Sequence, residues 1–171
     1  MNDTTSTTTA PSDPAAAGAA APADAPSLIL TWDDVATGGA DLGGGVYLAT
    51  AGADGRPHVA WVSVGYGDEC LWFSTFGSSQ KAKNLRHDPG VALHWPERAD
   101  RLAFARGTAR LVSDRAESDQ LWDDGVLPYD PGAFFTGKDD PDLQFVQVHL
   151  RRVTFRSLFE PTAPPRVWTP R

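Results

Sequence analysis

The sequence predicts a mainly β fold: a partly open β-barrel of six to seven antiparallel strands with short helices on its flank. Stretches of alternating apolar and polar residues, typical of half-buried strands, recur from residue 46 onward. Glycine-containing turns separate the early stretches, and such turns join antiparallel neighbours. Strands in this number, with only short helices between them, fit a barrel better than a simple sandwich of hairpins.

Composition indicates one globular domain preceded by a tail. Of the 171 residues, 41% are hydrophobic and 10% aromatic, enough for one sizeable core. Residues 1–27 consist mainly of Ala, Thr, Pro, Ser and Asp without Lys or Arg, so we expect a disordered tail before a domain at 28–171. Pro14 and Pro22 interrupt its alanine tract, which argues against a secretory signal. No apolar run approaches membrane-spanning length, and we expect a cytoplasmic protein.

Charge and cysteine content exclude two further classes. The formal net charge is -7 and no basic run is present, which argues against a nucleic-acid-binding protein. The only cysteine, Cys70, lies within an alternating strand. It cannot form an intrachain disulfide, and we expect it to be a buried thiol.

The predicted elements in chain order are a helix (28–36), three strands (46–51, 57–66 and 70–75), a helix (78–87), two strands (90–95 and 102–112), a helix (114–122) and a last pair of strands (143–150 and 153–159). The run GGADLGGG after the first helix is interpreted as a turn, because no Gly-Lys-Ser/Thr motif follows it. Asp54–Gly55 favours a hairpin, so the first three strands should form an antiparallel meander. Pro89 ends the second helix, and Gly107 marks a bulge. Asp114 supplies the third helix with an acidic start.

The stretch LWFSTFGSSQKAKNLRHDP, residues 71–89, has the composition of an anion-binding site. Hydroxyl groups at a strand end, free N–H groups at a helix start and the ammonium group of Lys81 would converge there. A phosphate group would be held by this combination. The alternative is that Ser78 or Ser79 only caps the helix and that Lys81 is a solvated lysine.

No metal site or hydrolase motif is evident. The histidines lie on four different elements without metal-ligand spacing: His58, His87, His94 and His149. The acidic run at 137–142 lacks the alternation of a calcium loop, and no Gly-x-Ser-x-Gly motif occurs.

Two long segments resemble a known family. The run GRPHVAWVSVGYGDECLWFSTFGSSQKAKNLRHDPGVALHW followed by RLAFARGTARLV resembles the flavin-binding split β-barrel family that includes pyridoxamine 5'-phosphate oxidase. The later LWDDGVLPYDPGAFFTGKDDPDLQFVQV is similar to its general-stress-protein branch. The resemblance covers about residues 46–148.

This resemblance implies an FMN-binding split barrel that forms a homodimer, with FMN at the subunit interface. The phosphate would be held by the strand end and the helix that follows, and the isoalloxazine would lie against the second and third strands. Trp61 would either stack on the flavin or belong to the core. The residues implied as cofactor-binding are Val59, Ala60, Trp61, Val62, Ser74, Thr75, Ser79, Gln80 and Lys81.

The chain departs from the oxidase where positive charge is expected. Gln80 stands where the oxidase commonly has arginine, so Arg56, Arg101 or Arg106 would have to substitute, or FMN would bind more weakly. No Arg-x-His resembling the oxidase's substrate clamp occurs near the C-terminus, so oxidation of pyridoxamine phosphate itself is not expected.

The function predicted is an FMN-binding oxidoreductase acting on an unidentified small molecule, with no catalytic side chain assigned. Two alternatives remain open. The same fold could use a deazaflavin, a bilin or haem, the last with His58 or His94 as axial ligand. The protein could also be a non-catalytic flavin-binding stress-response protein.

Overall fold

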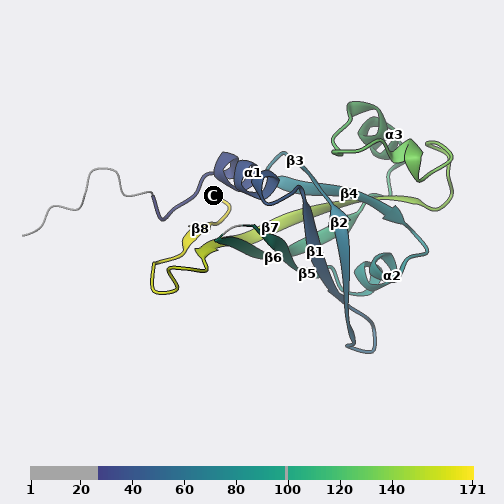
Figure 1. Ribbon diagram of the computed structural model, residues 1–171. Helices are drawn as coiled ribbons and strands as arrows, with labels where there is room; N and C mark the ends of the chain where they lie inside the picture. The colour runs from purple at the N-terminus through teal and green to yellow at the C-terminus, as the bar shows by residue number, and fades with distance from the viewer. Residues whose placement is uncertain (1–26, 99) are drawn as a thin grey trace, which may run out of the picture.

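Eight strands form one antiparallel sheet in the computed structural model, which describes residues 27–98 and 100–171. The disorder predicted for residues 1–27 therefore concerns a segment that, except for Ser27, lies outside the described residues. The elements are α1 (Trp32–Asp41), β1 (Gly45–Ala51), β2 (Pro57–Ser63), β3 (Gly65–Gly67), β4 (Cys70–Phe76), α2 (Gln80–His87), β5 (Gly90–Arg98), β6 (Arg101–Leu111), α3 (Arg115–Asp124), the 3-10 helix η1 (Pro131–Ala133), β7 (Leu143–Ser157) and β8 (Arg166–Trp168) (Figure 1).

The order of the strands requires the sheet to curl. It runs β2-β1-β5-β6-β7-β4-β3, and β8 pairs with β7 beside this path. The outermost strands, β2 and β3, are separated in sequence only by Val64, so the two edges of the sheet must come together. The result is a β-barrel flanked by short helices, as the sequence predicted.

Alternating residues of the strands fill the barrel. Leu48, Phe73 and Trp95 are among the largest fully buried side chains. Trp95 Nε1 donates a hydrogen bond to the hydroxyl of Tyr66 over 2.8 Å, which satisfies the buried indole. Burial raises the pKa of Tyr66 to about 12.

A second apolar cluster covers the outer face of β4. Cys70 and Trp72 pack there with Val112, Leu127 and Phe145, on the side where α3 and the following loop lie (Figure 1). Strand β4 is therefore buried on both faces. The prediction of a buried thiol at Cys70 is confirmed, and burial raises the pKa of that thiol.

The predicted helix 28–36 and the turn after it were misplaced. Helix α1 begins after the N-cap Thr31, whose capping box uses Asp34, and it continues through Gly38 and Gly39. A Cβ atom at Gly39 would lie 2.0 Å from Tyr66 Oη, so glycine is needed for the helix to pack against the barrel. Tertiary packing thus overrides the low helix propensity of glycine.

The strand predictions need three corrections. The predicted strand 57–66 divides at Val64 into β2, which pairs with β1, and β3, which pairs with β4. The predicted last pair is one strand, β7, in which Arg151 is the extra residue at the register shift opposite Arg106 and Gly107. This shift confirms the bulge expected at Gly107. Strand β8 was not predicted.

None of the helices in the described part of the chain is long and apolar enough to cross a membrane.

Candidate functional site

The junction of β4 and α2 gathers hydroxyl groups and one ammonium group. Ser79 is the N-cap of α2, and its Oγ accepts a hydrogen bond from the backbone N–H of Ala82 over 3.4 Å. Thr75, the last buried residue of β4, has its Oγ1 3.2 Å from Ser79 Oγ. The strand end and the helix start are therefore joined by side-chain hydroxyls, as the stretch 71–89 predicted.

Lys81 completes this cluster. Its Nζ donates to Thr75 Oγ1 over 3.0 Å, and its half-buried position lowers the pKa of the ammonium group through desolvation. An ammonium group has three donors, and this bond uses one of them. A bound anion would accept from the others and would favour the charged form of Lys81.

A cavity of about 380 Å³ opens beside the cluster. This volume lies within the roughly 300–1,000 Å³ usual for small-molecule sites. Its lining residues are Trp61, Val62, Ser63, Ser74, Thr75, Phe76, Lys81, Tyr129, Phe134 and Phe135. Lys81 is the one charged residue in this set, so the cavity combines a single cation with largely aromatic walls.

The aromatic wall comes from the loop after α3. Tyr129 and Phe134 meet edge to face with ring centroids 5.7 Å apart, and Phe135 packs on Phe76 at 5.0 Å. Sequence reasoning assigned none of these four aromatic residues to the site. The available signal was the segment at 121–148 that resembles the general-stress-protein branch, because it contains three of them.

Ser74 is engaged by the same loop. The hydroxyl of Tyr129 accepts from the backbone N–H of Ser74 over 3.0 Å and lies 2.9 Å from Ser74 Oγ. Ser74 lines the cavity, and its N–H and hydroxyl groups hold Tyr129 in place; its predicted role in binding the cofactor stays a prediction. The hydroxyl groups of Thr75 and Ser79 and the ammonium group of Lys81 remain together at the junction of β4 and α2, and of these three residues Thr75 and Lys81 line the cavity.

Ser78 and Gln80 have structural partners. The Ser78 N–H and hydroxyl both donate to the carboxylate of Asp142, each over 2.6 Å. Gln80 donates to Asn84 over 2.7 Å, and Asn84 donates in turn to Thr50 on β1. Neither residue lines the cavity. Of the two serines considered as caps, Ser79 caps α2.

The predicted residues of β2 divide between two faces. Val62 is buried, whereas Trp61 is 56% exposed and therefore does not belong to the core; both residues line the cavity. The Trp61 indole lies over Gly45, where a Cβ atom would come within 2.3 Å of it. Val59 and Ala60 do not line the cavity. In the described sheet β2 pairs only with β1, so its other edge keeps backbone groups free for a ligand.

None of the arginines considered as substitutes for Gln80 lines this cavity. Arg56 lies on the β1–β2 hairpin, pairs with Asp54 at 3.3 Å and has an 87% exposed side chain. Arg101 lines a different cavity. Among the described residues, Lys81 is therefore the only cation in the lining.

Comparison with protein-family models decides the family. The model described as pyridoxamine 5'-phosphate oxidase matches residues 45–157, more than half of the chain. The chain belongs to the pyridoxamine 5'-phosphate oxidase family. A search of curated protein sequences finds no match.

Several solved structures share the fold of this chain. A protein related to general stress protein 26, from Clostridium acetobutylicum, is 18% identical with a TM-score of 0.63, and the match covers 82% of this chain and 96% of the other. A pyridoxamine 5'-phosphate oxidase-related, FMN-binding protein from Nostoc punctiforme is 18% identical with a TM-score of 0.55 (80% and 88% covered). A NimC/NimA family protein from Clostridium acetobutylicum is 14% identical with a TM-score of 0.62 (77% and 91% covered).

The histidines named as possible haem ligands lie outside the lining of this family member's cavity. His94 is exposed on the outer face of β5. His58 Nδ1 is buried and, within the described residues, has no hydrogen-bond partner. The described residues also contain no cluster of three or more His, Cys, Asp or Glu side chains able to hold a metal ion.

Proposed function

We propose that the cavity binds FMN and that the protein is an FMN-dependent oxidoreductase. The observation that carries the proposal is the cluster of Thr75, Ser79 and Lys81 at the junction of β4 and α2, in which Thr75 and Lys81 line an aromatic cavity and Ser79 contacts Thr75. Helix starts attract phosphate through free N–H groups and the helix dipole. FMN combines such a phosphate with a planar ring system, which the two halves of the cavity match.

The aromatic part of the cavity suits the isoalloxazine. Trp61, Tyr129 and Phe134 offer ring surfaces, and the free edge of β2 offers backbone groups to the polar rim of a flavin. When bound, the flavin supplies the ability to accept and return electrons. This chain's residues position it and limit the access of water.

A phosphate group carries between one and two negative charges, whereas Lys81 supplies one positive charge to the cavity lining. We therefore propose a homodimer in which the partner completes the site. Residues directly opposite one another across β2, β1, β5 and β6 form a row on the outer face: Trp61, Tyr47, His94 and Phe104. In this row the side chains of Trp61, Tyr47 and Phe104 are 39–56% exposed. Exposed apolar surface of this kind marks interfaces between proteins. Trp61 belongs both to this row and to the lining of the cavity, so the proposed interface reaches the site.

The test is reconstitution of the purified chain with FMN, followed by absorption spectroscopy and light scattering. We expect one FMN per chain and a dimer. A haem spectrum in the purified protein, or a clean monomer that still binds FMN stoichiometrically, would contradict the cofactor or the interface, respectively.

The oxidoreductase activity has a separate test. The FMN-loaded protein is mixed with NADH or NADPH without oxygen, and bleaching of the flavin absorption is followed; the same sample then receives a quinone or nitroaromatic acceptor. We expect reduction and re-oxidation. A bound flavin that nicotinamides do not reduce, and that acceptors do not re-oxidise after photoreduction, would leave a binding protein without turnover.

A further inference from the structure

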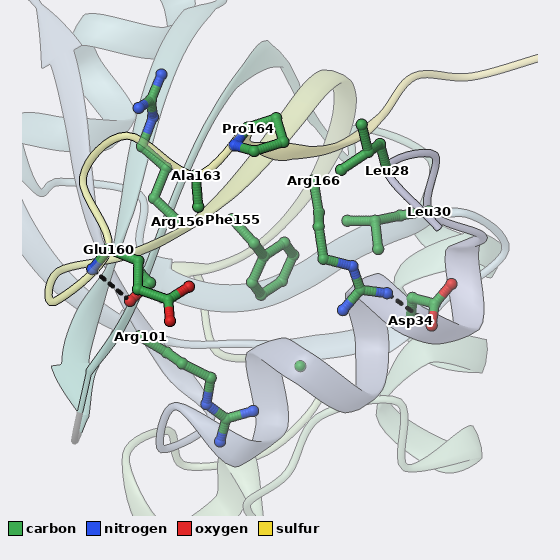
Figure 2. A pocket seen from close by; sticks show the side chains of 12 residues that line it. Leu28, Leu30, Asp34, Arg101, Phe155, Arg156, Glu160, Ala163, Pro164 and Arg166 are labelled. Atoms are coloured by element: carbon green, nitrogen blue, oxygen red, sulfur yellow. Dashed lines mark hydrogen bonds and ion pairs between the residues drawn. The ribbon is translucent and has the colours of Figure 1, made fainter. Parts of the chain in front are cut away.

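A second cavity, of about 430 Å³, lies beneath α1. Its walls come from α1, the start of β6, the end of β7, the loop after β7 and the start of β8 (Figure 2). It shares no lining residue with the cavity proposed for FMN. A ligand in this second cavity would therefore make no contact with residues that line the cavity proposed for FMN.

The centre of this cavity is apolar. The ring of Phe155 lies in the middle of it, with Leu28, Leu30 and Pro164 beside it (Figure 2). A Cβ atom at Gly38 would come within 2.8 Å of this ring, so glycine lets α1 approach the aromatic face closely. An apolar group of a ligand would be shielded from water there.

Two loosely paired guanidinium groups flank the apolar centre. Arg101 has its Nη1 3.6 Å from Asp41, and both side chains are about half exposed. Arg166 has its Nη2 3.8 Å from Asp34. These separations exceed hydrogen-bonding distance, so both guanidinium groups keep donors for a carboxylate.

Glu160 adds a negative charge on the side of Arg101. Figure 2 shows its carboxylate beside the Phe155 ring. Its backbone N–H donates to Ser157, but within residues 27–98 and 100–171 its carboxylate makes no hydrogen bond or ion pair. The cavity thus presents an apolar centre, guanidinium donors and an unpaired carboxylate together.

We propose that this cavity binds a free amino acid with an apolar side chain. The ligand carboxylate accepts from Arg101, the ligand ammonium donates to Glu160, and the side chain packs on Phe155. A fatty acid would use the arginine but would face repulsion from Glu160, whereas an amine would lack the arginine contact. Only a zwitterion with an apolar group uses all three features.

Three probes that differ by one charged group test the proposal by calorimetric titration of the full chain, with and without FMN. They are L-phenylalanine, 3-phenylpropanoate, which lacks the ammonium group, and 2-phenylethylamine, which lacks the carboxylate. We expect phenylalanine to bind at least about tenfold more tightly than either analogue, a factor that corresponds to 1.4 kcal/mol. Equal affinities, absence of saturable binding, or competition by FMN would overturn the proposal.

Two variants and a control locate the site. Arg101→Gln should weaken phenylalanine binding about tenfold, and Glu160→Gln should remove the advantage of phenylalanine over 3-phenylpropanoate. Arg152→Gln is the control, because Arg152 is exposed on the same strand as Phe155 and does not line the cavity. The exposed positions of these side chains predict unchanged melting temperatures. Unchanged binding in both test variants, or equal loss in the control, would contradict the assignment.

Discussion

Replacing Lys81 by methionine should weaken FMN binding while leaving the fold intact. Methionine keeps the apolar stem of the lysine but removes the ammonium group, which lies 3.0 Å from Thr75 Oγ1. A hydrogen bond to a charged group contributes about 1.5–3 kcal/mol, so the dissociation constant should rise about 10- to 150-fold. The upper part of this range is favoured, because burial has already removed some water from the ammonium group.

Lys83→Met provides a matched control on the same helix. Lys83 is exposed and does not line the cavity, yet its loss changes the net charge by the same amount. Both variants are titrated with FMN by flavin fluorescence at equal ionic strength. A dissociation constant for Lys81→Met within about twofold of the unmodified protein, or an equal loss of affinity in Lys83→Met, would exclude a specific contact between Lys81 and the phosphate.

Three further predictions concern packing, pH and assembly. Gly39→Ala should lower the free energy of unfolding by about 2–4 kcal/mol, because the new Cβ atom would lie 2.0 Å from Tyr66 Oη. A denaturant titration measures this change, and an unchanged midpoint would contradict the prediction. FMN affinity should fall as the pH rises through the pKa of Lys81, because the ammonium group then loses its charge; burial places this pKa below its usual range. The Lys81→Met variant should not show this fall. An equal fall in both proteins would mean that another group causes the pH dependence. Phe104→Asp should give a monomer by light scattering, because Phe104 belongs to the exposed row proposed as the dimer interface. Phe159 is 79% exposed and lies outside this row, so Phe159→Asp should remain a dimer. A persistent dimer in both variants would show that the interface lies elsewhere.

The sequence predicted the parts of the fold that depend on local pattern. Alternation located the strands, Pro89 limited α2, and Gly107 marked the register shift in the β6–β7 pair. The course of α1 through Gly39 could not be predicted locally. It depends on contact with Tyr66, a residue of a different element.

In the candidate site, too, contacts between residues close in sequence were predicted and contacts between distant segments were not. Thr75, Ser79 and Lys81 lie within seven residues of one another, so a strand end followed by a capped helix was enough to bring them together. Tyr129 reaches Ser74 from 55 residues away, through a loop without regular periodicity. Such a contact depends on how α3 and its loop fold back over β4, which no local pattern specifies.

The contribution of the FMN phosphate to the binding affinity is the most direct measure of whether the cluster at the β4–α2 junction is a phosphate site. Titrations of the unmodified protein with FMN and with riboflavin differ only in that group, which we assign to Thr75, Ser79 and Lys81. We predict that FMN binds at least about tenfold more tightly than riboflavin. Equal affinities for FMN and riboflavin would contradict the assignment of the cluster as a phosphate site.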